Sequence, residues 1–291
     1  MKDFAGRTAV ITGAGSGFGR EFAREAAARG MHLVLADIEA DALAASAHEL
    51  GSGGARVVAE VLDVADGAAV ARLADRAYVE FGAVHLLMNN AGVGSGGLLW
   101  ENSERDWQWV LGVNLWGVIH GVRQFVPRML AGGQGGHVVS TASVAGLLAA
   151  PNMGVYNVSK HAVVALTETL HHDLRLAGAA IGVSLLCPAY VPTGIAHSHR
   201  NRPAALRDSS PPTASQRAAQ AAIGKAVEGG RMTAAQVAQA TFEAVEQDRF
   251  YVLTHPQILP TVQLRFDDIL QQRNPSDPFT VKPQLKPRID G

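Results

Sequence analysis

The chain has 291 residues, and its 25 Lys and Arg against 26 Asp and Glu give a formal net charge of −1. No basic excess is therefore present to attract nucleic acid or an anionic membrane surface. No run approaches the roughly 18 uninterrupted apolar residues of a membrane span. The single cysteine, Cys187, excludes an intrachain disulfide and suits a reducing compartment. Because the first apolar run, 9–11, is too short for a signal peptide, we expect a soluble cytoplasmic protein.

Short β-rich runs alternate with longer segments of helical apolar spacing through the first two thirds of the chain. The predicted strands are 8–12, 32–36, 56–61, 85–89, 137–141 and 181–186. The predicted helices between them are 18–29, 41–50, 68–81, 106–130 and 155–176. Several strands are apolar on both faces, as in a parallel sheet covered by helices on each side. The pattern predicts an α/β fold, with a Rossmann-like doubly wound parallel sheet flanked by helices in a single domain.

The last third of the chain has a different character. Residues 197–230 are rich in Ala, Gln, Ser, Arg and Pro, and we expect a substrate-covering segment with short helical pieces. A helix over 233–247 and a short strand over 250–254 should complete the domain, which we place at 1–273. Prolines at 275, 278, 283 and 287 predict an extended tail over 274–291.

Four glycines, Gly13, Gly15, Gly17 and Gly19, lie between the first predicted strand and the first predicted helix. Glycines there let backbone N–H groups approach a pyrophosphate closely, at a helix N-terminus that favours negative charge. The alternative is an ordinary tight turn, but the strand before it and the helix after it favour a nucleotide site. The cofactor contacts expected from this loop are Gly13, Ser16, Gly17, Phe18 and Gly19.

Asp37 ends the second predicted strand, 18 residues after Gly19. A carboxylate at this place can accept hydrogen bonds from the adenosine ribose and would repel a 2′-phosphate. Neither Ser16 nor Ile38 is basic, so the sequence favours NAD over NADP as cofactor. Asp37 could also cap the following helix, and the two roles are compatible.

Three motifs then follow one another in a recognisable order: TGxxxGxG at 12–19, NNAG at 89–92 and YxxxK at 156–160. With this set the sequence resembles the short-chain dehydrogenase/reductase family over roughly 5–255. The resemblance implies that Asp63 and Val64 contact adenine and that the NNAG segment runs beside the adenine-side ribose. It also implies that the segment 187–193 holds the nicotinamide carboxamide. The cofactor-binding residues implied in these three places are Asp63, Val64, Asn90, Ala91, Gly92, Pro188, Val191 and Thr193.

The segment 187–193 departs from the family pattern at two positions. Ala189 stands where glycine is usual, and Pro192 is additional. These differences put the local backbone shape in question.

Tyr156 and Lys160 have the residue types and the spacing for acid–base chemistry. Hydride transfer at a carbonyl carbon needs a proton transfer at its oxygen, which a positioned phenol can perform. A free phenol has a pKa of about 10, and a cation four residues along a helix would lower it. By spacing alone the two could form a solvated surface pair, but the position after the fifth strand favours catalysis. The resemblance implies that Lys160 also binds the nicotinamide ribose.

Two further residues complete the expected catalytic set. By resemblance, Ser143 would donate a hydrogen bond to the substrate oxygen, and Asn114 would keep a water in contact with the lysine. The alternatives are a turn serine and a packed helix amide.

The leading hypothesis is an NAD-dependent oxidoreductase that interconverts a hydrophobic or aromatic secondary alcohol and its ketone. We expect substrate contacts from 94–100, 144–153 and 189–230. The alternatives are an NADP-dependent ketone reductase of the same family and a non-catalytic nucleotide-sensing protein. The expected partner is the small-molecule substrate, without nucleic acid or membrane, and family resemblance suggests a homo-oligomer, a tetramer or a dimer. The apolar positions expected to face the substrate are Val144, Leu147, Leu148, Met153, Tyr190 and Ile195.

Histidines, tryptophans and the cysteine invite other interpretations. His171 and His172, like His197 and His199, are poor chelating pairs without a carboxylate cluster, so we expect no metal. The four tryptophans fit a core or a subunit interface better than a substrate site. Cys187 fits packing better than nucleophilic chemistry.

Overall fold

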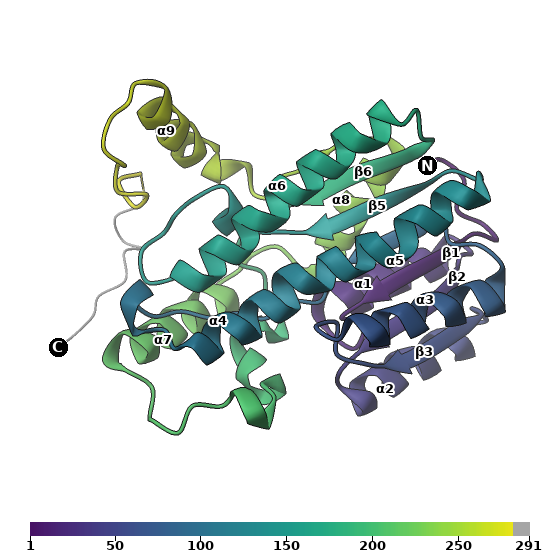
Figure 1. Cartoon of the computed structure of the whole chain (residues 1–291), viewed down its shortest axis with the longest axis horizontal. Helices are drawn as coiled ribbons and strands as arrows, with labels where there is room; N and C mark the ends of the chain where they lie inside the picture. The colour runs from purple at the N-terminus through teal and green to yellow at the C-terminus, as the bar shows by residue number, and fades with distance from the viewer. Residues whose placement is uncertain (282–291) are drawn as a thin grey trace.

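The computed structural model describes residues 1–281, and a seven-stranded sheet lies at the centre of this part (Figure 1). Its spatial order is β3-β2-β1-β4-β5-β6-β7, and every neighbouring pair is parallel. The order reverses between β1 and β4, so the predicted doubly wound sheet is confirmed. The strands are β1 (Thr8–Thr12), β2 (His32–Asp37), β3 (Val57–Val61), β4 (Leu86–Asn89), β5 (Gly136–Thr141), β6 (Ile181–Leu186) and β7 (Tyr251–Val252).

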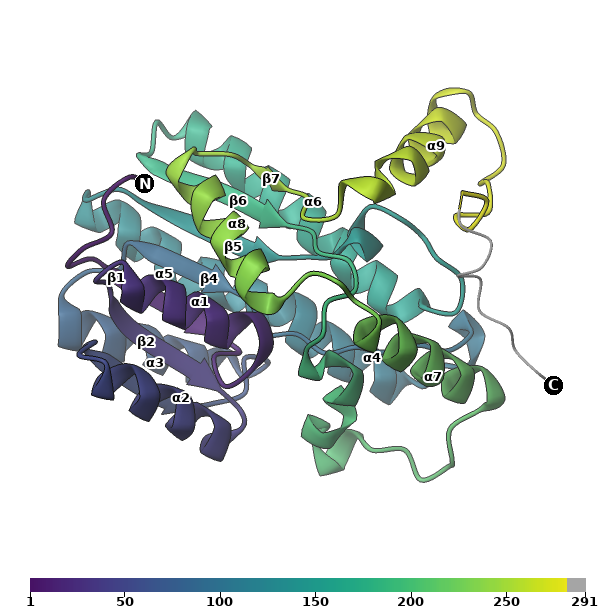
Figure 2. The ribbon, with the colours of Figure 1, turned by 180° about the vertical axis from the view of Figure 1, so that it is seen from behind.

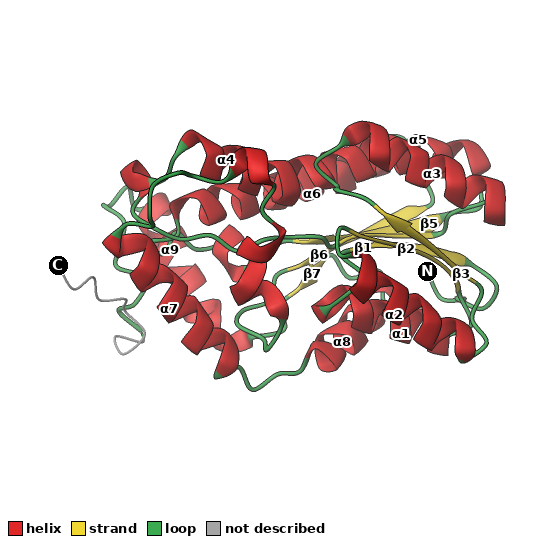
Figure 3. Cartoon of the chain, turned by 90° about the horizontal axis from the view of Figure 1, so that it is seen from below, coloured by secondary structure: helices red, strands yellow, loops and turns green. Residues whose placement is uncertain are grey.

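Helices cover both faces of the sheet, which Figure 3 shows edge-on as the middle of three layers. One face carries α1 (Gly17–Ala28), α2 (Ala40–Ser52) and α8 (Ala234–Glu246). The other carries α3 (Gly67–Phe81), α5 (Gly117–Gly132) and α6 (Gly154–Leu176). With both faces covered, the central strands are largely buried, and all five residues of β1 are buried.

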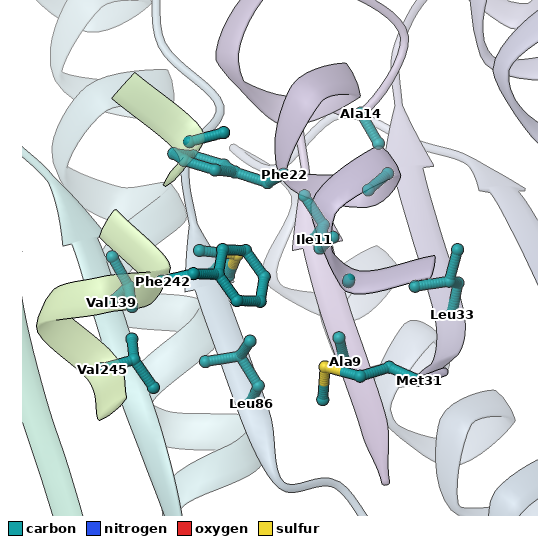
Figure 4. Close-up of a cluster of buried hydrophobic side chains, with 14 of the residues drawn as sticks. Ala9, Ile11, Ala14, Phe22, Met31, Leu33, Leu86, Val139, Phe242 and Val245 are labelled. Carbon is teal, nitrogen blue, oxygen red and sulfur yellow. The ribbon is translucent and has the colours of Figure 1, made fainter. Parts of the chain in front are cut away.

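The larger core cluster packs α1 and α8 against the sheet (Figure 4). Phe22 of α1 and Phe242 of α8 are fully buried there, against Ile11 and Leu86 of the central strands. Burying one such side chain contributes about 1.5–3 kcal/mol. This packing fixes α1, and therefore the loop that precedes it, against the centre of the sheet.

The predicted helix over 106–130 is confirmed as a continuous helical stretch, 104–132, but it contains a π-helical turn that was not predicted. The chain forms α4 (Glu104–Leu111), a π-helical turn (Gly112–Trp116) and then α5. A Cβ on Gly117 would lie 2.8 Å from Cγ2 of Val64, so only glycine lets the turn pack this closely on the loop after β3. Apolar spacing alone does not reveal such a turn, because a π turn inserts one residue without interrupting the helix.

The segment after β6 is more regular than predicted. It contains 3₁₀ turns at Gly194–Asn201 and Ala204–Leu206 and then a long helix, α7 (Ala214–Glu228), where only short helical pieces were expected. A reciprocal capping box between Thr213 and Gln216 begins α7, and its alanine-rich sequence sustains it.

The C-terminal part adds a helix that the sequence did not predict. After a 3₁₀ turn at Pro256–Ile258, α9 (Leu259–Leu270) extends away from the sheet, as Figures 1 and 2 show in yellow. Beyond it, the backbone N–H of Ser276 donates to a buried carboxylate, that of Asp268, at 2.8 Å, and residues 278–281 form turns. The predicted extended tail is therefore wrong for these residues, and its remainder, 282–291, lies outside the described residues. No helix within 1–281 is long and apolar enough to cross a membrane.

Candidate active site

A cleft of about 1450 Å³ lies where the strands end at their carboxyl edge. Its walls come from the loops after β1, β2, β4, β5 and β6, and α7 closes one side. Ligands of doubly wound sheets bind at this edge, beside the reversal in strand order. The sequence-predicted residues that line it are Gly13, Ser16, Gly17, Phe18, Asp37, Asp63, Val64, Asn90, Ala91, Gly92, Ser143, Tyr156, Lys160, Pro188, Val191 and Thr193.

The glycine loop occupies the space between β1 and the start of α1. Gly13 has φ +69°, and a Cβ there would lie 2.9 Å from Cα of Ala91. A Cβ on Gly19 would overlap the carbonyl oxygen of Gly13, so Gly19 lies behind the loop and supports it from within the molecule. Because α1 begins at Gly17, the N–H groups of its first turn have no partner inside the helix and can bind an anion.

Thr12 braces this loop, a role that the sequence analysis did not assign to it. Its hydroxyl accepts hydrogen bonds from the backbone N–H groups of Asn90 (2.9 Å) and Ala91 (3.1 Å). The side-chain amide of Asn90 donates to the carbonyl of Thr12, and its oxygen accepts from the hydroxyl of Thr141. The ends of β1, β4 and β5 are thereby joined across the floor of the cleft.

Asp37 lies at the end of β2, between two backbone donors. Oδ2 accepts from the N–H of Gly15 at 2.8 Å, and Oδ1 accepts from the N–H of Glu39 at 2.9 Å. The carboxylate is therefore fixed beside the glycine loop while still lining the cleft. The alternative role as a helix cap is not observed, because Glu39 is the N-cap of α2.

The loop after β3 brings Asp63 and Val64 to the same cleft. Oδ1 of Asp63 accepts from the N–H of Ala65 at 2.9 Å, which shapes the turn. Val64 is buried against the π turn at Gly117. Together they form an apolar and an acidic wall at the end of the cleft beside β2 and β3.

Ser143, Tyr156 and Lys160 meet at the other end of the cleft. The Nζ of Lys160 lies 5.7 Å from the centre of the Tyr156 ring and donates to the carbonyl of Thr141 at 2.9 Å. Ser143 lies at the end of β5, and its hydroxyl accepts from the N–H of Ala145 and contacts the carbonyl of Pro188 at 3.3 Å. The sheet and α6 therefore bring the three predicted side chains together.

The prediction that Lys160 lowers the pKa of Tyr156 is wrong. Burial raises the pKa of Tyr156 to about 12, and a hydrogen bond from Ser143 lowers it only in part. Burial also lowers the pKa of Lys160 to about 8. Desolvation disfavours both charged forms, so it outweighs the attraction that residue spacing suggested.

Asn114 is completely buried in the π turn and does not line the cleft. Its amide nitrogen donates to the carbonyl of Val93 (3.0 Å) and to the Ser159 hydroxyl (3.1 Å), and its oxygen accepts from the N–H of Val93 (2.8 Å). These bonds connect the loop after β4 to α6, the helix that carries Lys160. Its side chain thus has the packed-amide arrangement that the sequence left open as an alternative.

The segment after β6 follows the cleft without a strained backbone at Ala189. The N–H of Ala189 donates to Nδ1 of His255 at 3.2 Å, a contact that no sequence motif indicated. Thr193 packs against the glycine loop, because a Cβ added at Gly17 would lie 3.3 Å from the Cβ of Thr193. The segment 187–193 therefore forms the wall of the cleft next to the glycine loop.

The expected substrate end is lined mainly by apolar side chains. Val144, Leu148, Met153, Tyr190 and Ile195 face the cleft. Leu147 is not among the lining residues and packs in a small core cluster beside α6. Residues outside the segments expected to contact the substrate also line the cleft: Trp109, Met232, Pro278 and Phe279.

The remaining candidate residues lie apart from this chemistry. Cys187 is fully buried, and burial raises its pKa to about 12, which agrees with the predicted packing role. Trp109 is buried in the core, whereas Trp100 and Trp116 are largely exposed. Within residues 1–281 no group of three His, Cys, Asp or Glu side chains could hold a metal ion.

Comparisons with known proteins agree with this geometry. Residues 7–204 match a family model described as short chain dehydrogenase. The CLA biosynthesis dehydrogenase/reductase of Lactiplantibacillus plantarum is 34% identical over 278 residues, which cover 94% of this chain and 97% of that protein. The C alpha-dehydrogenase of Sphingobium is also 34% identical, over 98% of this chain and 93% of its own.

A solved structure gives a closer match. A short chain dehydrogenase/reductase from Burkholderia phymatum, determined in complex with NAD, is 59% identical. It superimposes with a TM-score of 0.94 over 95% of this chain and 99% of that one.

Proposed function

Because the chain belongs to the short chain dehydrogenase family, we propose that it is an NAD-dependent oxidoreductase that interconverts a hydrophobic or aromatic secondary alcohol and its ketone. The observation that carries this proposal is one cleft with a glycine loop and Asp37 at one end and Ser143, Tyr156 and Lys160 at the other. A dinucleotide has a diphosphate, an adenosine ribose and a reactive ring at corresponding separate positions. Relatives from Lactiplantibacillus plantarum, Sphingobium and Streptomyces avermitilis are dehydrogenases by name.

The residues present fit a nicotinamide dinucleotide. Side chains at Gly13 and Gly19 would fill the loop, which indicates that a ligand or a neighbouring backbone must approach it closely. Asp37 offers its carboxylate to ribose hydroxyls and would repel a 2′-phosphate, and the relative from Burkholderia holds NAD. When bound, the nicotinamide supplies or accepts the hydride. These observations support NAD over NADP.

The catalytic roles follow from the positions of three side chains. In ketone reduction the phenol of Tyr156 donates its proton to the carbonyl oxygen, and in alcohol oxidation the phenolate accepts the hydroxyl proton. With its pKa raised by burial, Tyr156 holds its proton at neutral pH and is suited to act as the acid. Ser143, held by Ala145, directs its hydroxyl at the same oxygen.

Lys160 and Asn114 have supporting roles in this proposal. Lys160 is buried beneath the Tyr156 ring, where its ammonium favours the phenolate whenever that forms. Asn114 fixes the loop after β4 to α6 through its three hydrogen bonds and so positions the lysine.

The substrate class follows from the lining of the cleft. Val144, Leu148, Met153, Tyr190 and Ile195 offer apolar surface around Tyr156, which a hydrophobic or aromatic ketone would bury. Cytoplasmic location and a homo-oligomeric state stay predictions from the sequence.

A panel of aliphatic, aromatic and phosphorylated ketones, each with NADH or NADPH, tests the proposal. We expect oxidation of NADH with apolar ketones and little with sugar phosphates. If NAD stabilises the protein against heat but no ketone or alcohol on the panel reacts, the nucleotide-sensing alternative replaces the proposal. A preference for NADPH would overturn the assignment of Asp37.

A further inference from the structure

Residues 193–202, which we name the strap, run across the cleft at the ends of three strands. Thr193 lies against Gly17 after β1, and the Ser198 hydroxyl accepts from the N–H of Gly94 after β4 at 3.0 Å. Within the strap, the side chains of Ala196 and Ser198 are buried. The strap therefore passes over the part of the cleft to which the proposed function assigns the dinucleotide.

The far end of the strap is tied to the loop after β2 by an ion pair. The guanidinium of Arg200 binds the carboxylate of Glu39 through Nη2 (2.5 Å) and Nε (3.2 Å). Asn201 adds a hydrogen bond to the same carboxylate at 2.8 Å. The hydrogen bond from Arg200 keeps the pKa of Glu39 below its usual value, so the pair is charged at neutral pH.

Both partners of this pair are held by their own surroundings. The N–H of Glu39 is fixed by Asp37, the residue assigned to the adenosine ribose. The Nη1 of Arg200 donates to the carbonyls of Gly194 and His197 within the strap. The pair thus connects two preorganised segments, and its geometry is bidentate, the arrangement in which Arg–carboxylate pairs are strongest.

Two residues after Arg200, the strap is anchored much more firmly. Arg202 is buried and binds Asp106 of α4 at 2.6 Å and Asp208 at 3.0 Å, with Trp109 beneath its guanidinium. By contrast, the side chains of Arg200 and Glu39 are 40% and 29% exposed. If the strap moves, the exposed pair with Glu39 therefore opens while Arg202 stays in place.

We propose that Glu39 is a cofactor-retaining residue, which holds the strap closed over the cleft through Arg200, so that this pair must open before the dinucleotide leaves. The inference rests on the proposed binding of a nicotinamide dinucleotide. The pair between Glu39 and Arg200 then helps to set the residence time of the bound dinucleotide, a role that no motif around Asp37 or the glycine loop indicates.

Stopped-flow measurement of NADH release tests the proposal, with the fluorescence of the bound nucleotide as the signal. Bidentate but partly exposed pairs contribute up to about 1 kcal/mol, so release from Glu39→Gln should be about three- to fivefold faster than from the wild type. Release from Arg200→Gln should be at least as fast, because this variant also loses the bonds to the carbonyls of Gly194 and His197, and the double variant should be no faster than Arg200→Gln. Asp75→Asn, which breaks the exposed pair with Arg128 outside the cleft, is the matched control and should leave release unchanged.

Hydrogen exchange of the strap, measured without added nucleotide, gives an independent readout. Amides in 194–201 should exchange faster in Glu39→Gln than in the wild type, whereas α3 and α5 should not change. Unchanged release in both single variants, or additive effects in the double variant, would overturn the inference. Failure of the wild-type protein to bind NADH would instead overturn the proposed function, so the two failures are distinguishable.

Discussion

Replacement of Gly19 by alanine tests how the structure builds the cofactor loop. The new Cβ would overlap the carbonyl oxygen of Gly13 and lie 2.6 Å from the carbon of that carbonyl and 2.8 Å from Nδ2 of Asn90. Two of these three atoms belong to backbone, so the loop itself must move. Overpacking of this kind costs about 1–3 kcal/mol, while alanine in place of glycine in a helix returns up to about 1 kcal/mol.

We therefore expect Gly19→Ala to lower the free energy of unfolding by about 1–2 kcal/mol and to weaken NAD binding at least about tenfold. Urea unfolding followed by circular dichroism gives the first quantity, and calorimetric titration with NAD gives the second. Gly224→Ala in α7 is the control, because nothing lies within 4 Å of its added Cβ. It should be as stable as the wild type or more stable, with unchanged affinity. Wild-type NAD affinity in Gly19→Ala would refute this reading of the loop.

Three further predictions follow from buried charged and titratable groups. Arg202→Met leaves the carboxylate of Asp106 buried without its partner. The free energy of unfolding, measured by urea titration, should therefore fall by about 3 kcal/mol or more. A fall of less than about 1 kcal/mol would contradict the burial of this ion pair. Burial lowers the pKa of His137 from 6.5 to about 3, so between these values the unfolded chain binds a proton that the folded protein does not. The free energy of unfolding of the wild type should therefore fall by about 2 kcal/mol from pH 7 to pH 5. His137→Gln should remove most of this pH dependence, whereas the control His172→Gln, at an exposed position, should leave it unchanged. If the free energy of unfolding changed equally with pH in the wild type and in both variants, another group would be responsible. Asp37→Ala should reduce the preference for NADH over NADPH at least about tenfold in steady-state kinetics, and an unaltered preference would exclude Asp37 as the ribose ligand.

The strands and the helices that cover the sheet could be predicted because burial on both faces leaves a strong local signature. β1 and β6 have their predicted bounds, and α1 and α6 differ from theirs by one residue at most. The π turn before α5 could not be predicted in this way, because it interrupts no apolar pattern. α7 was underestimated because its alanines and glutamines carry little amphipathic signal, although Thr213 begins it with a capping box.

Most of the site residues that the motifs identified line the cleft, but the motifs indicated few of the contacts that support them. Thr12 braces the NNAG loop from 78 residues away, and Arg200 reaches Glu39 from 161 residues away. Such pairs are formed by the order of the strands in space, which residue spacing along the chain does not encode. The Tyr156 pKa was mispredicted for a related reason, because spacing identifies a neighbouring cation but not the desolvation of both groups.

The rate of ketone reduction in Tyr156→Phe, compared with its NADH affinity, tests the central claim most directly. A positioned acid contributes about 10²–10⁴-fold, so the rate should fall by at least about a hundredfold while NADH binding stays within about twofold of the wild type. Tyr190→Phe is the matched control, since that phenol also lines the cleft but contacts only the Met153 sulfur, at 4.0 Å, and its rate should fall less than about tenfold. Reduction by Tyr156→Phe at a rate close to that of the wild type would contradict the proposed chemistry.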